Sequence, residues 1–110
     1  MTRARKNVPK TGGSSPPLAP LIHGRVRLLI LSYLMSHAVS ATFTELRAAL
    51  GLTDGTLSVH LTRLERGGMV SLQKRFVRKR PQTVVRVTAD GRRRFERYVA
   101  ELRGIVPGLS

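Results

Sequence analysis

The middle of the chain carries leucines at the spacing of an α-helix. Leu57, Leu61 and Leu64 are four and three residues apart, so the segment 54–66 is predicted to form a helix that buries one side. A threonine precedes the segment as a capping residue, and a pair of glycines is expected to end it. The residues between the leucines are mostly short and polar, and they would form the exposed side of this helix.

A shorter helix is predicted over residues 43–50. Thr42 and Glu45 have the spacing of a capping box, in which each side chain bonds the backbone amide of the other residue. Gly51 is placed to end the helix in the left-handed conformation. Only Gly51 and Leu52 separate this helix from Thr53, the cap of the next helix, which is the tight connection of a helix-turn-helix.

The N-terminal helix is predicted to be apolar on two sides, although Gly24 weakens its first turn. One side carries, at helical spacing, Ile22, Val26, Leu29, Ile30, Tyr33, Leu34 and His37. The other side carries Leu28, Leu31 and Met35. A helix with two apolar sides is expected to contact both its own core and a second surface, such as a partner subunit.

The C-terminal half predicts a hairpin and then a last helix. Val70, Leu72 and, more loosely, Phe76 alternate with polar residues, the segment RKRPQ (78–82) interrupts the pattern, and TVVRVT (83–88) resumes it with β-branched residues. We therefore expect two strands with a basic loop at their tip. The last helix follows a capping threonine and has an apolar stripe at spacings of four, three and four, formed by Phe95, Val99, Leu102 and Val106.

These elements predict a mostly α fold with a small β-hairpin wing (α+β), namely a winged helix-turn-helix with an additional C-terminal helix. With 110 residues the chain has room for one domain, which we place at residues 21–106. Residues 1–20 are rich in Pro, Gly, Ser and basic residues and are expected to form a disordered basic arm. Residues 107–110 are expected to be a C-terminal tail.

Net charge points to the kind of partner. The chain has 20 Lys and Arg against 6 Asp and Glu, a formal charge of +14, and such a field attracts polyanions. Most of the cations are Arg, whose planar fork matches phosphate oxygens and guanine edges. An anionic membrane is disfavoured, because no amphipathic helix combines a basic face with opposed Trp or Phe. A solvated basic surface with no partner is the remaining alternative.

Several function classes find no support in the sequence. Without cysteine there is no disulfide, thiolate zinc site or cysteine nucleophile, which fits a cytoplasmic protein. The longest apolar run, 26–35, is too short to span a bilayer. His23, His37 and His60 are scattered, so we expect no metal site, no cofactor and no enzyme, and we interpret His37 as a helix-capping cation or a packed core residue.

The predicted helix 54–66 is the candidate recognition helix, because short side chains let a helix enter the major groove of double-stranded DNA. Its candidate contacts are Asp54, Gly55, Thr56, Ser58, Val59, His60, Thr62 and Arg63. The wing, about 74–86, is expected to hold phosphates or a minor groove through Lys74, Arg75, Arg78, Lys79, Arg80 and Arg86. A minor-groove arm is considered at Arg3, Arg5 and Lys6.

Three stretches of the sequence, LIHGRVRLLILSYL, FTELRAALGLTDGTLSVHLTRLERGGMV and KRFVRKRPQTVVRVTADGRRRFERYVAELRGIV, together resemble the small single-domain winged-helix transcriptional regulators of the MarR-like group. The resemblance covers residues 21–106. It implies a homodimeric DNA-binding protein whose terminal helices form the dimer. The candidate interface residues are Leu28, Leu31, Met35, Phe95, Val99, Leu102 and Val106.

Two other functions stay open at this point. A non-sequence-specific architectural DNA- or RNA-binding protein would need the same charge, and an interaction module would bind another protein through the apolar faces of the first and last helices. A small-molecule effector is also left open, although a domain of this size leaves little volume for it.

Overall fold

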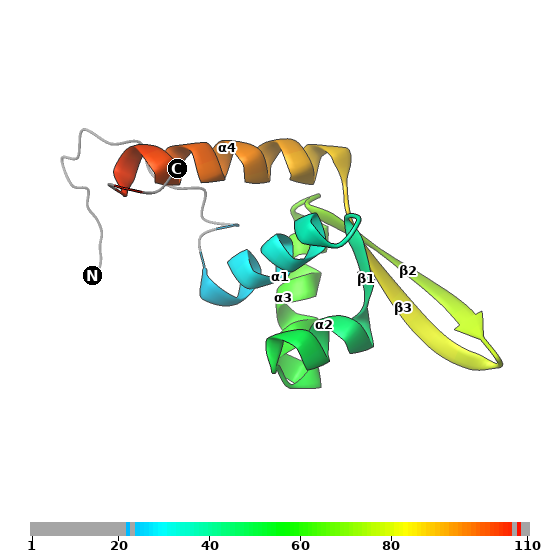
Figure 1. Cartoon of the computed structure of the whole chain (residues 1–110). Coiled ribbons are helices and arrows are strands. Elements are labelled where there is room, and N and C mark those ends of the chain that lie inside the picture. The colour runs from blue at the N-terminus through cyan, green and yellow to red at the C-terminus, as the bar shows by residue number, and fades with distance from the viewer. Residues whose placement is uncertain (1–21, 23, 107, 109–110) are drawn as a thin grey trace, which may run out of the picture.

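The computed structural model describes residues 22, 24–106 and 108, and it folds this part of the chain into four helices and a three-stranded antiparallel sheet (Figure 1). The elements in chain order are α1 (Arg25–Ser36), β1 (Ser40–Thr42), α2 (Phe43–Leu50), α3 (Asp54–Arg66), β2 (Val70–Val77), β3 (Arg80–Val87) and α4 (Ala89–Ile105). This is a winged helix α+β fold, as predicted.

Three threonines start three of the helices in the same way. The hydroxyls of Thr42, Thr53 and Thr88 accept from the amides of Glu45, Thr56 and Gly91. In the first of these, the Glu45 carboxylate also accepts from the Thr42 amide at 2.9 Å, which completes the predicted capping box. Each cap satisfies an amide that the helix itself leaves free, and replacing such a residue by alanine typically costs about 1 kcal/mol.

The core lies where α1, α2, α3 and the base of the hairpin meet. Leu57, Leu61 and Leu64 are buried, which confirms the predicted inner side of α3. The remaining buried apolar side chains come from the other helices, the strands and two segments outside these elements, namely Ile22, Ile30, Leu31, Leu34, Ala41, Leu46, Met69, Val70, Val85, Val87, Phe95 and Tyr98. Each fully buried leucine contributes about 2 kcal/mol of transfer free energy.

The two predicted sides of α1 are divided differently in the structure. The helix begins at Arg25 with Gly24 as its N-cap, so the glycine precedes the helix and does not weaken its first turn. Leu31 is fully buried with Ile30 and Leu34, whereas Leu29 is only half-buried. Phe95 of α4 is also in the core, at 8% exposure. Leu31 and Phe95, which the sequence placed at a dimer interface, therefore pack in the core of the chain and offer almost no surface for contact with a second copy.

The hairpin is longer and its turn tighter than the sequence predicts. β2 and β3 stay paired out to Val77 and Arg80, so the expected five-residue loop is a two-residue turn of Arg78 and Lys79. Pro81 lies inside β3, opposite Phe76. A proline is tolerated there because β1 pairs with β3 only at residues 84–86, which leaves that edge of β3 free.

The first turn of α4 is held close to the residues that precede β2. The Thr88 hydroxyl lies 2.6 Å from the Gly68 carbonyl oxygen and the Thr88 amide donates to the Met69 carbonyl at 3.0 Å. Gly91 passes so close to Met69 that a Cβ at this position would collide with its carbonyl group. From this contact α4 runs along the side of the molecule opposite α2, above α1 in the view of Figure 1.

Several predictions lie outside the described residues. They include the arm 1–20 with Arg3, Arg5 and Lys6, and the tail 107–110 apart from Gly108. Within the described part, none of the helices has both the length and the hydropathy needed to cross a membrane.

Candidate nucleic-acid interface

The outer side of α3 is exposed and largely uncharged, as the leucine pattern predicts. Seven of the eight candidate contacts on this helix are exposed, namely Asp54, Gly55, Thr56, Ser58, Val59, Thr62 and Arg63. Val59 has 52% of its surface in water, which is high for a branched apolar side chain. A shallow hollow on this side is formed by Ser58, Val59, Thr62, Arg63 and Arg66. The hollow combines hydroxyls, one apolar group and two guanidinium groups on a single helix face.

Two of the candidate residues also hold the local structure. Asp54 Oδ1 lies 3.0 Å from Arg47 Nη1, so α2 neutralises the one carboxylate at the start of α3. Both side chains are exposed, and the pair contributes little to stability. Thr56 shares a hydroxyl hydrogen bond of 3.0 Å with the capping Thr53. These contacts place Asp54 beside the exposed face, where it repels phosphate less than a free carboxylate would.

His60 differs from the other candidates because it is half-buried between α3 and α1. Its Nδ1 lies 3.2 Å from Nη1 of Arg27. A guanidinium only donates, so Nδ1 must accept and the ring proton resides on Nε2. Burial, followed by the charges of Arg27 and Arg63, lowers the pKa of His60. The neutral ring is therefore the form that fits this site.

This arrangement predicts a loss of stability in acid. The unfolded chain, with an ordinary histidine pKa of about 6.5, takes up a proton more readily than the folded protein, so the free energy of unfolding falls as pH drops below that value. His60→Gln removes the titrating group, and we expect the melting temperature of this variant to change less than that of the wild type between neutral and mildly acidic pH. An equal change in both proteins would contradict the assignment.

The wing, defined here as β2, the two-residue turn and β3, carries the six predicted cations, and all six are exposed. They do not form one cluster. Strand alternation puts Lys74 on the side of the half-buried Leu72, which faces α3, and puts Arg75 and Arg86 on the opposite side. Arg86 is also at the base of the wing, opposite Ser71 and far from the turn. Arg75 donates to Gln82 Oε1 at 2.8 Å.

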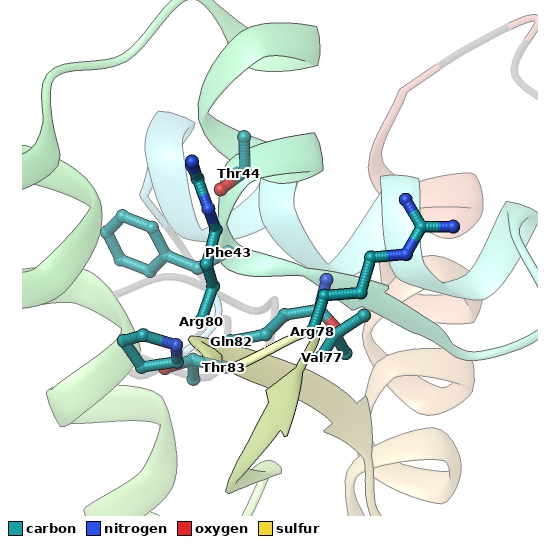
Figure 2. Close-up of a pocket in the computed structure, with 8 residues that line it drawn as sticks. Phe43, Thr44, Val77, Arg78, Arg80, Gln82 and Thr83 are labelled. Atoms are coloured by element: carbon teal, nitrogen blue, oxygen red, sulfur yellow. The ribbon is translucent and has the colours of Figure 1, made fainter.

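A groove connects α3 with the α3-facing side of the wing. Its lining includes Ser58 and Thr62 of α3 and Lys74 and Thr83 of the wing. A second, open groove lies between the first turn of α2 and the tip, and Figure 2 shows the Arg80 side chain reaching along it toward Thr44. The exposed side of α3, both grooves and the tip therefore form a continuous surface that is cationic at its outer end.

Some residues of this surface were missed by sequence reasoning. Arg66 follows Val59 by seven positions and Thr62 by four, so the helical period could have identified it. Arg27 could not have been found in this way, because its contact with His60 joins residues 33 positions apart. Thr44 lies beside the wing only because β1, a strand of three residues, pairs with β3. A segment this short has no readable periodicity.

His37 is neither in the core nor part of the surface described above. It is exposed at the end of α1, where its ring stacks on Tyr33 at 3.9 Å and its Nδ1 lies 2.7 Å from the Tyr33 carbonyl oxygen. His37 therefore caps α1 and is not a packed core residue. Among the described residues there is no group of three His, Cys, Asp or Glu side chains that could hold a metal ion.

Known proteins share both the sequence and the fold. An uncharacterized protein of Methanocaldococcus jannaschii, MJ0432, is 36% identical over 78 residues, which cover 71% of this chain and 82% of the relative. A transcriptional regulator homologue from Pyrococcus horikoshii OT3 superposes with a TM-score of 0.74 at 33% identity, over 82% of this chain and 88% of that one.

Regulators of the MarR family are also among the structural neighbours. AbfR of Staphylococcus epidermidis, solved in its reduced form bound to DNA, gives a TM-score of 0.66 at 26% identity over 74% of this chain. The match covers 55% of AbfR, which is therefore much the longer protein. The fold and family are those of transcriptional regulators and not of enzymes. Because residues 26–106 match the family described as Winged helix DNA-binding domain, the chain belongs to that family of DNA-binding transcriptional regulators.

Proposed function

We propose that the protein recognises specific sequences in double-stranded DNA as a homodimer, with α3 in the major groove and the wing on phosphates or in the adjacent minor groove. Binding at a promoter would then block or aid polymerase. The observation that supports this best is the exposed side of α3, where small polar side chains lie next to a cationic wing. A DNA-bound structure of AbfR, a neighbour of this fold, adds support for DNA as the partner.

Each group on the α3 surface suits a different feature of DNA. The Ser58 and Thr62 hydroxyls can bond phosphate oxygens or base edges, and Val59 suits contact with the thymine methyl group. Arg63 has the fork geometry for a guanine edge. Neighbouring hydroxyls leave room for the helix to approach the floor of the groove, whose width of about 12 Å just admits a helix. These side chains would provide base readout, whereas the wing would position the protein.

The dimer is proposed from the apolar residues that the core leaves partly uncovered. Leu28 and Met35 of α1 and Val99 and Leu102 of α4 pack on the core yet stay half-exposed. At the end of α4, Ile105 and Val106 expose 44% and 43% of their surface. A second copy would cover this surface through the same residues on both subunits, as two-fold symmetry requires. The two α3 helices would then enter successive major grooves about 34 Å apart.

The rival function is an architectural protein that binds DNA or RNA through charge alone. Both proposals predict strong salt dependence. If each subunit of a dimer neutralises about four phosphates, the slope of log K against log salt should be near −7. They differ in base preference, which contacts from α3 would create and charge alone would not.

Two arginine variants separate these functions. Arg63→Ala is expected to relax base preference at one position of each half-site, at a cost of about 1–3 kcal/mol for the preferred base. Arg78→Ala should weaken binding to every duplex alike and reduce the salt slope by about one unit per subunit. The measurement is titration of each variant against the duplex that the wild-type protein selects and against single-base variants of it. Identical behaviour of the two variants would refute the proposed division of roles.

A further inference from the structure

The wing exposes an aromatic side chain, and neither packing in the core nor electrostatic attraction accounts for its position. Phe76 has 76% of its surface in water, the largest exposure among the large hydrophobic side chains of the described residues. Val59, next in order, exposes 52%. Phenylalanine is among the side chains most often buried, and an isolated ring at the end of a hairpin also invites aggregation. We therefore expect the exposed Phe76 ring to contact a binding partner.

The ring lies on the side of the wing that faces α3. Along β2 the residues of this side run from the buried Val70 and the half-buried Leu72 through Lys74 to Phe76. Across the hairpin, Phe76 is opposite Pro81. This cross-strand pair leaves most of the ring uncovered, so hairpin stabilisation accounts for only part of its surface. The rest of the ring surface lies on the side of the wing that faces α3, where the DNA would be bound.

Four cationic residues lie close to Phe76 along the sequence. Arg75 precedes Phe76, and Arg78, Lys79 and Arg80 follow it around the turn, all of them exposed. Strand alternation puts Arg75 and Arg80 on the opposite side of the wing, so Arg78 and Lys79 of the turn are the cations that could hold a polyanion against the ring. Such a charge pattern suits a nucleic acid better than an apolar protein surface, because docking on the latter would bury cations without counterions.

We propose that Phe76 is a wedge that enters the minor groove of DNA and inserts part way between two stacked base pairs, while the cations beside it hold the flanking phosphates. This inference rests on the proposed binding of DNA by the wing. An apolar wedge unstacks one base step and bends the duplex toward the major groove. Pyrimidine–purine steps such as TA unstack most easily, so the wedge adds a sequence preference where no base-edge hydrogen bond is made.

The chain contains no tryptophan, which allows a direct optical test with Phe76→Trp. The probe is a short duplex of alternating A and T, in which every second step is TA. We expect the indole emission to be strongly quenched on binding, because the ring stacks on bases. Val77→Trp is the matched control, since it places the same ring one residue further on, on the other side of the wing. Its quenching should be much weaker.

A second readout follows the DNA. When 2-aminopurine replaces adenines of the same duplex, wild-type protein should raise its fluorescence by unstacking it, and Phe76→Ala should abolish that rise. Phe76→Ala should also weaken binding about tenfold while leaving the salt slope unchanged, because phenylalanine carries no charge. Circular dichroism of each variant checks that the fold is retained.

The outcomes distinguish the wedge from the function on which it rests. If Phe76→Trp binds the duplex with normal salt dependence but stays as bright as in the free protein, the wedge is refuted and DNA binding stands. If the wild type binds neither this duplex nor duplexes of random sequence, the proposed function itself fails. If Phe76→Ala leaves DNA binding unchanged but alters the mass of the protein in solution, the ring is a contact between copies of the chain and the wedge is refuted.

Discussion

Replacing Arg78 with Asn and Lys79 with Gly should make the protein more stable and a much weaker DNA binder. Both residues have positive φ, 54° and 66°, in a two-residue hairpin turn. That conformation favours Asn-Gly and costs about 1 kcal/mol for most other L-residues. We expect the double substitution to raise the free energy of unfolding by about 1 kcal/mol.

The loss of binding should be far larger than this gain in stability. A dimer would lose four cations at its two tips, which reduces the salt slope by about 3–4 units and the affinity at 0.1 M salt by about 10³-fold. Urea unfolding and DNA titration on the same preparations measure the two effects. Arg92→Gln with Arg97→Gln is the control, because it removes as many charges from the exposed side of α4. If both double variants weakened binding equally, the tip would act only through net charge.

Gly91→Ala is expected to destabilise the domain by about 3 kcal/mol, near the upper end of overpacking substitutions. The added Cβ would lie 2.9 Å from the Met69 carbonyl carbon and closer still to its oxygen. Both neighbours are backbone atoms, so relief requires α4 to move away from the hairpin. That movement would also break the hydrogen bonds of Thr88.

The matched control for this prediction is Gly104→Ala in the same helix, where an added Cβ meets nothing within 4 Å. Alanine is the better helix former, so this variant should be more stable by about 0.5–1 kcal/mol. Thermal or urea unfolding of the two variants should therefore give shifts of opposite sign. A Gly91→Ala protein as stable as the wild type would mean that α4 does not approach Met69 this closely.

The sequence predicted most accurately those features that local spacing alone determines. The bounds of α2 and α3, their threonine caps and the buried leucines of α3 all follow from residues within one or two helical turns of each other. The exposed side of α3 followed as the complement of those leucines. For this reason most of the candidate contacts could be named before the fold was known.

Features that depend on distant contacts could not be predicted in this way. In α1, apolar residues are so dense that spacing could not decide which side is inner, and the tertiary packing of the core placed Leu31 inside. The need for glycine at position 91 arises from Met69, which the chain brings near only after the hairpin has formed. The half-burial of His60 likewise depends on α1.

The turn of the wing was predicted wrongly for a different reason. Its two residues are not the ones that a turn of this type favours. Arg-Lys is a poor choice for a turn that requires two positive φ values, so a longer loop was the reasonable prediction. Local rules are most often broken where function demands it. A tight turn extends the paired strands and holds the two cations at the extreme end of the wing, where a loop would let them spread.

Selection of binding sites from random duplexes by the purified protein shows whether α3 reads base sequence. We expect enrichment of two inverted half-sites with centres about 10 base pairs apart, and loss of one preferred base in each half-site with Arg63→Ala. Recovery of duplexes with no shared sequence, bound equally well by the wild type and by Arg63→Ala, would contradict this expectation.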